Sequence, residues 1–489
     1  MQFSYSFLIL ALSPLLFVPS LSVPTDPSFF ANQLVNHFSA ASSTYSQRYY
    51  EQKKYWRGPG SPIFMVMGGE GAIEPETGLF YPYINEVLAS EYGAYVVEPE
   101  HRFYGESTPV SDPSNDDLKD LMTPMNALAD AVYLVKDLQS RLGCGPRGAP
   151  EYCPVITVGG SYPGFLSFAM RLRYPGVIDG AYAAGAPVKF YAQQVEQNKY
   201  YDLISASAER SLAGCEGAIG KTMNSVADSL VSSSDFVSYS VERLNVCETV
   251  PEYMASDPEV FLQELTMVVA YTFANYNMAN YPPDNSTDLH ATCQLLVESN
   301  GTPEQKVGEI LMGVAGDDAE CFDFSTQLPA GAHSTVSSGD WSGVGSGNNG
   351  KMWDFQTCSL LVERIGITET FVKRDWTIEW MKDHCEERFR VTPKPSYLAE
   401  MWGFEDVATS GATRVLFTNG LNDGWSVGSI TESPDEGKGL IALNFPNGAH
   451  HSDLSHSDPG PQDTQDIQEG HKEISKIIGA WLEEIIQGA

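Results

Sequence analysis

A serine lies at the tip of a glycine-rich turn, between an apolar run and a helical pattern. The run 155–158 leads into Gly-Gly-Ser-Tyr-Pro-Gly at 159–164, in which Ser161 is the third residue. A buried strand, a sharp turn with serine at its apex and a following helix make up a nucleophile elbow. The helix N-terminus behind the serine offers backbone N–H groups to a developing oxyanion. Pro163 replaces the usual glycine, and proline is tolerated in a first helical turn. The alternative is an ordinary strand-to-helix turn without chemistry.

A catalytic serine needs a base, and the base needs an acid that orients it. Both candidates lie in the C-terminal part of the chain, each just after a predicted strand. Asp423 follows the apolar run 414–418, and His450 follows the apolar run 439–443. The order Ser, Asp, His along the chain is that of the α/β-hydrolases. Asp423 alone could form a turn, and His450 alone could be a loop residue. Three such residues at strand ends in this order predict a catalytic triad.

The elements that must position these residues alternate between strand and helix. Short apolar runs over 45–110 indicate strands joined by turns, and 124–142 has apolar residues on one side of a helix. This alternation indicates a parallel sheet. Helical periodicity then fills 190–320 and returns over 352–405, with a glycine- and serine-rich loop at 329–351. The individual segments predicted are the strands 62–67, 94–97 and 154–158, the helices 216–232 and 258–275, and a last helix over 469–486.

We therefore predict an α/β-hydrolase fold with a large, mainly helical cap inserted between the nucleophile and the acid. The chain divides into a signal peptide, two parts of the hydrolase domain, and the cap between them. The predicted boundaries are 1–22 for the signal peptide, 23–190 and 406–489 for the hydrolase domain, and 191–405 for the cap.

The first residues and the cysteines indicate that the chain is exported. Phe7–Val18 is an apolar run of signal-peptide length, too short to span a bilayer, and a small-x-small cleavage site precedes Val23. The alternative for this run is a buried N-terminal strand. The eight cysteines include no C-x-x-C pair, so we expect up to four disulfides rather than a zinc cluster. The one pairing we predict joins Cys144 and Cys153, which are close enough to close a small loop.

Sequons and charge are compatible with a secreted glycoprotein. Asn285 and Asn300 each begin an N-x-S/T sequon, so both are candidate glycosylation sites. The net charge of −34 argues against nucleic acid or an anionic membrane as a partner, because both would repel such a surface. An acidic working compartment would explain this charge, since protonation of carboxylates relieves self-repulsion. The other explanation is that the charge keeps a secreted protein soluble.

Motifs spread along the chain resemble those of the prolyl carboxypeptidase and dipeptidyl-peptidase II family of serine peptidases, which includes fungal secreted prolyl endopeptidases. The resemblance covers nearly the whole mature chain and explains the displaced glycine after Ser161. One motif differs, because the family usually has proline after the acid and this chain has Gly424. The motifs are Gly-Gly-Glu-Gly at 68–71, Glu-His-Arg-Phe-Tyr-Gly-Glu-Ser at 100–107, the serine turn at 159–164, Trp-Asp-Phe-Gln-Thr-Cys at 353–358, and the segments 419–425 and 448–454.

Carried over by position, the resemblance implies that Ser161 is the nucleophile and Asp423 the orienting acid. His450 would be the general base in preference to its neighbour His451. The reaction would need no metal and no organic cofactor, because a serine, a histidine and an acid suffice for acyl transfer.

The resemblance also implies an oxyanion hole. The backbone N–H of Tyr162 would form one half, and Gly69 and Glu70 of the early glycine-rich loop would supply the other. His101 and Arg102 are expected to belong to a structural polar network near the site rather than to the chemistry.

Substrate contacts are expected beside the triad and in the cap. A preference for proline is an implication of the resemblance, and an aromatic wall suits a rigid pyrrolidine ring. Trp425 and Phe165 are candidates for this wall, with core packing as the alternative. Trp353 and Gln356 of the cap motif are further candidates. Glu70 could bind the amino terminus of a substrate or form a structural ion pair.

The prediction is a secreted serine peptidase that cuts after proline through an acyl-enzyme intermediate. Dipeptidyl-peptidase, carboxypeptidase and endopeptidase action all remain open. The alternatives are a secreted lipase or esterase with the same triad, and a hydrolase-fold binding protein without catalysis. The expected partners are peptide or protein substrates, not nucleic acid or membranes, and the protein could be a monomer or a homodimer. The expected location is extracellular or an acidic vacuolar or lysosomal compartment.

Overall fold

The computed structural model describes residues 26–73, 81–316, 318–327, 350–455 and 463–488. The predicted signal peptide lies outside the described residues, as does nearly all of the predicted loop 329–351. Within the described residues no helix is both long enough and apolar enough to cross a membrane.

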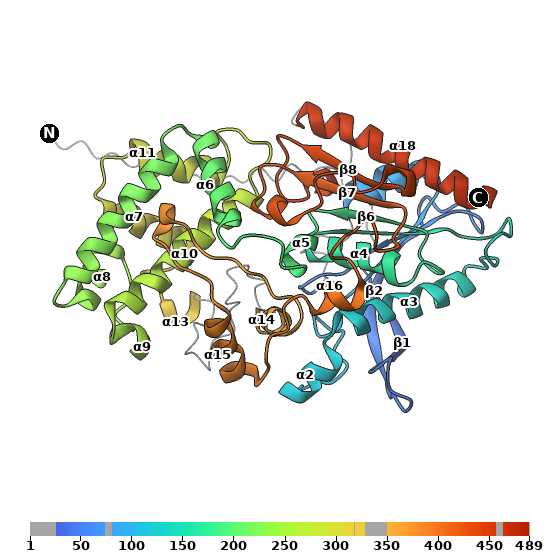
Figure 1. Cartoon of the computed structure of the whole chain (residues 1–489), viewed down its shortest axis with the longest axis horizontal. Coiled ribbons are helices and arrows are strands. Elements are labelled where there is room, and N and C mark those ends of the chain that lie inside the picture. The colour runs from blue at the N-terminus through green and yellow to red at the C-terminus, as the bar shows by residue number, and fades with distance from the viewer. Residues whose placement is uncertain (1–25, 74–80, 317, 328–349, 456–462, 489) are drawn as a thin grey trace.

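An eight-stranded sheet forms the centre of one half of the molecule (Figure 1). Its strand order is β1-β2-β4-β3-β5-β6-β7-β8, and all neighbours from β4 to β8 are parallel. The two antiparallel pairings are those of β1 with β2 and of β2 with β4. The strands are β1 (Ser28–Leu34), β2 (Thr44–Gln52), β3 (Ile63–Val66), β4 (Tyr95–Pro99), β5 (Val155–Gly160), β6 (Gly180–Ala184), β7 (Val415–Gly420) and β8 (Leu440–Phe445).

Helices cover both faces of this sheet, as an α/β-hydrolase fold requires, and the predicted fold class is confirmed. Alternate residues of β3 enter different cores, because successive side chains of a strand point to opposite faces: Ile63 and Met65 join one cluster, Phe64 and Val66 the other. The first cluster lies under α3 (Pro124–Arg141), α4 (Tyr162–Arg173) and α16 (Tyr397–Trp402). The second lies under η2 (Tyr83–Leu88), α1 (Ala89–Tyr92) and α18 (Gln465–Gln487).

A second, helical part lies beside the sheet and has a hydrophobic core of its own (Figure 1). Its two longest helices match the predicted segments 216–232 and 258–275. The domain boundaries drawn from the sequence stay predictions. The helices of this part are α6 (Lys199–Ser211), α7 (Cys215–Ser232), α8 (Phe236–Leu244), α9 (Glu252–Ala255), α10 (Pro258–Met278), α11 (Asp288–Glu298), α12 (Pro303–Ala315) and α13 (Phe324–Gln327).

Shorter elements connect the two parts or lie at their edges. The cap motif 353–358 falls on α14, which lies near α15 between the helical part and the sheet (Figure 1). These elements are α2 (Asn115–Leu121), α5 (Val188–Tyr191), α14 (Gly350–Ser359), η4 (Glu369–Phe371), α15 (Ile378–Phe389), η5 (Gly424–Gly428), η6 (Glu436–Lys438) and α17 (Ser452–Ser455).

One stretch differs from the prediction of strands and turns over 45–110. Residues 83–92 form the helical elements η2 and α1 instead. Ile84, Leu88 and Ala89 are buried at helical spacing, so packing against the sheet favours a helix here. The strand β6 also escaped prediction, because Gly-Ala-Tyr-Ala-Ala lacks the β-branched residues that mark strands.

Four disulfides use all eight cysteines, as expected. The predicted pair Cys144–Cys153 is confirmed. The other three lie in or beside the helical part: Cys215–Cys293, Cys247–Cys321 and Cys358–Cys385. Both sequon asparagines, Asn285 and Asn300, are exposed, and their glycosylation stays a prediction.

Candidate active site

Ser161 stands in a strained turn between β5 and α4. Its φ of 61° and ψ of −132° lie in a region that non-glycine residues rarely adopt. Neighbours without side chains make the turn possible, since a Cβ on Gly159 would come 2.3 Å from the carbonyl oxygen of Pro163. The sequence motif thus has the strand-turn-helix geometry of a nucleophile elbow.

Asp423 and His450 are brought together by the parallel ends of β7 and β8. Asp423 Oδ2 lies 2.6 Å from His450 Nδ1, and Asp423 Oδ1 accepts a hydrogen bond from the backbone N–H of Trp425 at 3.0 Å. The aspartate side chain is 1% exposed, so water does not compete for these bonds. An aspartate on Nδ1 holds the imidazole with Nε2 free to take a proton.

The imidazole of His450 lies beside the strand end that neighbours Ser161. Gly160 pairs with Ala184 across β5 and β6, and the backbone N–H of Ser161 donates to the Ala184 carbonyl at 2.8 Å. A Cβ on the next residue, Gly185, would lie 3.3 Å from His450 Nδ1. Among the described residues no hydrogen bond joins the Ser161 hydroxyl to His450. Such bonds are often long without substrate and tighten in the complex.

His451, the neighbouring candidate, has a different environment. Its ring packs against Gly160, where a Cβ would come 2.7 Å from the imidazole. Burial lowers the pKa of His451 to about 3, so the ring is neutral at ordinary pH. Asp423 therefore bonds to His450, the histidine that the resemblance favoured as base. The ring of His451 packs against Gly160 in the serine turn instead.

The two loops expected to form an oxyanion hole meet at the start of α4. Tyr162 is the first residue of that helix, and a Cβ on Gly69 would lie 2.7 Å from the ring of Pro163. Glu70 follows Gly69 and is partly exposed. Loss of water around the carboxyl raises its pKa, and a hydrogen bond to its own backbone and the field of His450 partly offset this rise. Glu70 pairs with no lysine or arginine among the described residues, so the structural ion pair considered from sequence is not found there.

A buried polar cluster supports Tyr162 from below. The Tyr162 hydroxyl accepts from Gln356 Nε2 at 3.0 Å and lies 3.0 Å from His101 Nε2. Gln356 Oε1 accepts from the Tyr104 hydroxyl at 2.6 Å, so both ends of the amide are engaged. The ring of Trp353 lies 5.2 Å from that of Tyr162. Trp353 and Gln356 thus contact the elbow rather than the triad.

His101 and Arg102 belong to a buried polar network, as expected. Arg102 forms an ion pair with Asp130 and donates to the carbonyl of Leu121. His37 contacts the same carboxylate at 2.8 Å. Burial lowers the pKa of His101 to about 4.

The two aromatic candidates for a pocket wall occupy different places. Trp425 lies beside the triad, with its ring centroid 6.3 Å from that of His450 and 4.9 Å from that of Tyr200. Phe165 is fully buried and packs on Tyr191 and Phe404. Trp425 is also buried, at 2% exposed, in the core of the helical part, so both rings pack in cores and only Trp425 does so next to the triad.

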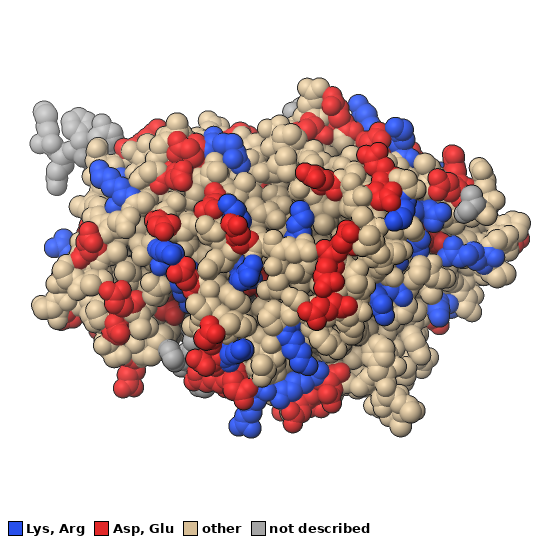
Figure 2. All heavy atoms as spheres, viewed as in Figure 1, with Lys and Arg blue, Asp and Glu red and all other residues tan. Residues whose placement is uncertain are grey.

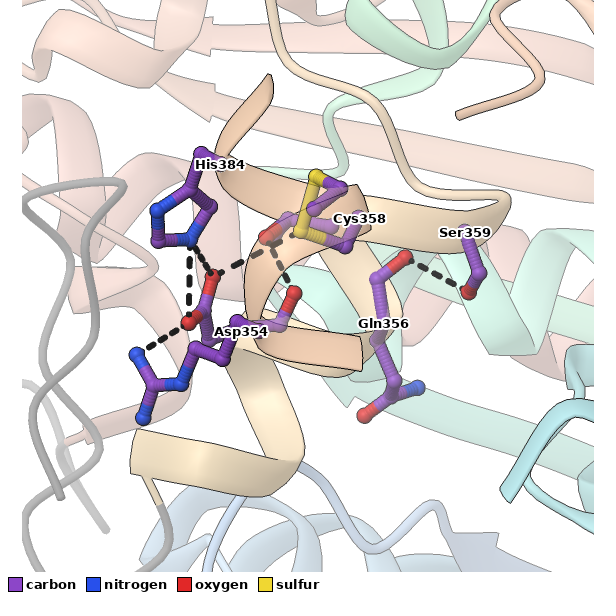
Figure 3. Close-up of a disulfide and its surroundings, with 8 residues drawn as sticks. Asp354, Gln356, Cys358, Ser359 and His384 are labelled. Carbon is purple, nitrogen blue, oxygen red and sulfur yellow. Dashed lines mark hydrogen bonds and ion pairs between the residues drawn. A yellow bond between two sulfur atoms is a disulfide. The ribbon is translucent and has the colours of Figure 1, made fainter. Parts of the chain in front are cut away.

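A cluster on α14 and α15 has the residue types of a metal site but other bonds. Asp354, Cys358 and His384 lie together (Figure 3). The Cys358 sulfur is in the disulfide to Cys385, and Asp354 is paired with His384 at 3.0 Å and with Arg388. A disulfide sulfur and a doubly paired carboxylate are not available as metal ligands.

Sequence reasoning missed a third acid close to the site. Glu363 is 4% exposed, and its Oε1 accepts from the Tyr191 hydroxyl at 3.3 Å. Burial is the main cause that raises its pKa to about 8, and the charge of Glu70 adds to the rise. The only signal in the sequence was a glutamate at the end of the apolar run 360–362.

A parallel sheet with a serine elbow and an Asp–His pair at the ends of its strands defines a serine hydrolase of the α/β-hydrolase class. The family model for serine carboxypeptidase S28 matches residues 33–474. The chain therefore belongs to the serine carboxypeptidase S28 family and is a serine peptidase.

Relatives with assigned names cover most of the chain. Lysosomal Pro-X carboxypeptidase of Homo sapiens is 28% identical over 462 residues, which cover 89% of this chain and 86% of the relative. Thymus-specific serine protease of Mus musculus is 27% identical, with 93% and 87% covered. Among solved structures, proline iminopeptidase of Mycobacterium smegmatis matches 94% of this chain and 99% of its own, at 14% identity and a TM-score of 0.33.

Proposed function

We propose that this peptidase hydrolyses peptide bonds after proline, with Ser161 as nucleophile, His450 as general base and Asp423 as the acid that orients it. The observation that carries this proposal is the 2.6 Å contact between Asp423 and His450 beside the strained turn of Ser161. Two other Asp–His ion pairs among the described residues, Asp354–His384 and Asp130–His37, are each shared with an arginine.

The proposed reaction is acyl transfer in two steps. Ser161 Oγ attacks the peptide carbonyl carbon while His450 Nε2 takes the hydroxyl proton. His450 then gives this proton to the leaving amine as the C–N bond breaks. Water attacks the acyl-enzyme by the same route and frees the serine. The N–H of Tyr162 and an N–H of the 69–70 loop would hold the negative oxygen of each tetrahedral intermediate.

Specificity for proline rests on the relatives and on one aromatic side chain. The curated relative cited above is named for action on Pro-X bonds. Trp425 lies beside His450 with 2% of its surface exposed, and a rigid pyrrolidine ring packs on an aromatic edge at little entropic cost. We propose that Trp425 contacts the proline, and that Trp353 and Gln356 act through the position of Tyr162.

The proposed substrates are peptides or proteins in an exported or acidic lysosomal setting. The named relative is a lysosomal protein, and the acidic composition of this chain would be less self-repelling at low pH. Acidic and basic side chains alternate over the face drawn in Figure 2, with no extended basic surface there for nucleic acid.

Digestion of a defined peptide mixture tests the proposal. New termini read by mass spectrometry should all follow proline. Loss of single C-terminal residues would identify carboxypeptidase action, release of amino-terminal dipeptides would identify dipeptidyl action, and internal cuts would identify an endopeptidase. Cuts without regard to proline, or turnover of a long-chain nitrophenyl ester alone, would contradict the proposed specificity.

A further inference from the structure

The last turn of α10 reaches from the helical part to the loop that carries Asp423. Asn277 lies in this turn and is fully buried, at 0% exposed. Its Nδ2 donates to the backbone carbonyl of Asn422 at 2.7 Å, and its Oδ1 accepts the backbone N–H of Gly424 at 2.8 Å. One side-chain amide therefore joins the residues immediately before and after the acid.

The two partners fix the orientation of this amide. A backbone carbonyl only accepts a hydrogen bond and a backbone N–H only donates one, so an amide turned the other way would lose both bonds. An apolar side chain at 277 would take away the partner of the Gly424 N–H, which is a buried donor. The loss of such a partner costs more than the bond itself contributes to stability.

Gly424 explains why the loop needs this support. A Cβ at this position would lie 2.9 Å from the ring of Tyr200 and 3.1 Å from Ile204, both on α6, so the helical part excludes a side chain here. Proline, which the family usually has at this position, would have no N–H to donate. Because glycine leaves the backbone beside Asp423 freer to rotate than other residues do, a restraint from outside the loop has a large effect.

The next residue of α10 contacts the other half of the Asp–His pair. Met278 ends the helix, so its carbonyl has no partner within the helix. This carbonyl accepts the backbone N–H of His450 at 3.3 Å, and the Met278 sulfur lies 3.3 Å from Trp425 Nε1. Two consecutive residues of one helix thus contact the loop of the acid and the loop of the base.

We propose that Asn277 is a positioning residue, which holds the carboxylate of Asp423 against His450 and so couples the docking of α10 to the activity of the triad. Without its two bonds, rotation between Asp423 and Gly424 would carry the carboxylate away from His450 Nδ1, which it contacts at 2.6 Å. This inference rests on the proposed function, because it assumes that the Asp–His pair acts on Ser161.

Asn277→Leu removes both bonds with a side chain of similar size. We expect kcat on a Pro-linked peptide to fall by about 10²-fold with KM little changed, because small displacements of catalytic groups are that costly. The rate constant for labelling of Ser161 by a fluorophosphonate should fall in parallel. A partly unfolded sample would lower the labelled fraction but not the rate constant of the folded molecules, so this rate separates positioning from loss of fold.

Ser207→Ala is the matched control. Ser207 is a buried residue of α6, and its Oγ donates to the same Asn422 carbonyl at 2.8 Å. The variant removes one bond between the helical part and the acid loop but keeps both bonds of Asn277. Its labelling rate should stay close to that of wild type, although its melting temperature falls. An Asn277→Leu enzyme labelled as fast as wild type, or equal slowing in both variants, would overturn the positioning role.

Asn277→Asp tests the same role through pH. A protonated carboxyl accepts through one oxygen and donates through the other, as the amide does, whereas a carboxylate cannot donate. The labelling rate relative to wild type should therefore be highest at low pH and fall as pH rises through the pKa of the introduced acid, ordinarily about 4 and raised by burial.

The other titratable groups around position 277 are present in both proteins, so the ratio of the two labelling rates largely cancels their titration. They are Asp423 and His450 of the triad and, on α6, Tyr200 and Arg210, which donates to the Asn422 side chain. A ratio that stays low at acid pH, where the introduced carboxyl is protonated, would contradict the role of Asn277.

Failure of the proposed function would give a different result. If wild type is labelled at Ser161 but does not cut after proline, the proline specificity fails alone and the labelling rates still decide the role of Asn277. If folded wild type is not labelled, the proposed triad fails and the role of Asn277 fails with it.

Discussion

Asp423 Oδ2 and His450 Nδ1 are 2.6 Å apart, although 27 residues separate them in the chain. Two parallel strands, β7 and β8, carry them to the same edge of the sheet where β5 ends at the serine turn. Ligands and catalytic groups of open parallel sheets gather at the carboxyl ends of the strands. The predictions below follow from this arrangement and from the groups packed around it.

Replacement of Asp423 by asparagine should remove activity without unfolding the protein. The amide oxygen can still accept from the Trp425 N–H, so the turn into η5 is kept. The amide no longer holds the imidazole in the right tautomer, and kcat should fall by about 10⁴-fold. Steady-state kinetics together with a thermal melt checks this. A variant with more than a tenth of wild-type kcat would exclude Asp423 as the orienting acid.

Tyr162→Phe should act on kcat more than on KM. The change leaves Gln356 Nε2 and His101 Nε2 without their common partner, at a cost of about 1–3 kcal/mol in stability. The backbone N–H of residue 162 would then be less well fixed toward the oxyanion. Tyr104→Phe, which removes the bond to Gln356 Oε1 and leaves the Tyr162 hydroxyl in place, is the control and should lower stability with less effect on kcat. Equal effects of the two variants on kcat would argue against a positioning role for this cluster.

The disulfides should differ in their contribution to stability. Cys215–Cys293 spans a sequence separation of 78 residues and Cys144–Cys153 one of 9. Chain-entropy reasoning gives about 4.5 kcal/mol for the first and about 2.6 kcal/mol for the second. Double replacement by alanine at 215 and 293 should therefore lower the melting temperature further than replacement at 144 and 153. The reverse order in calorimetric melts would show that local packing outweighs loop entropy here.

Glu363 should make the folded protein less stable as pH rises. Its pKa is about 8 in the folded state against an ordinary value of 4.5. Below pH 4.5 both states hold the proton. Between pH 4.5 and 8 the unfolded chain loses it while the folded state keeps it, so stability falls as pH rises. The Tyr191 hydroxyl contacts this carboxyl and the charge of Glu70 acts on it, while Glu264, Lys373, Arg374 and Asp375 line the same cavity.

The Glu363→Gln variant tests this linkage, because the amide is neutral in both states. Its melting temperature relative to wild type should increase from pH 4.5 to pH 8. A constant difference across this range would show that Glu363 titrates normally. His101 gives the opposite trend in both proteins, since its pKa of about 4 removes stability as pH falls below 6.5.

The sequence alone predicted the parts of the fold with strong local patterns. The strand 154–158, the helix 124–142 and the helix 258–275 appear as β5, α3 and α10. These segments carry clear apolar runs or helical periodicity. The strand β6 and the helical stretch 83–92 were missed, since their structure is set by packing on the sheet rather than by local composition.

The residues of the site also fall into those that the sequence could predict and those that it could not. Ser161, Asp423 and His450 follow strands and could be named in advance, whereas the role of each in catalysis stays a prediction. Glu363 was missed because nothing in the sequence shows that a glutamate between α14 and η4 would be buried against the Tyr191 hydroxyl. Such contacts depend on how the cap docks, and no local pattern encodes it.

The most direct test of the central claim is covalent labelling by a fluorophosphonate, which reacts with an activated serine. Mass spectrometry of the labelled wild-type enzyme should place the adduct on the peptide that contains Ser161. Ser161→Ala should give no adduct, although its melting temperature is close to that of wild type. An adduct at another serine, or equal labelling of a folded Ser161→Ala protein, would contradict the account.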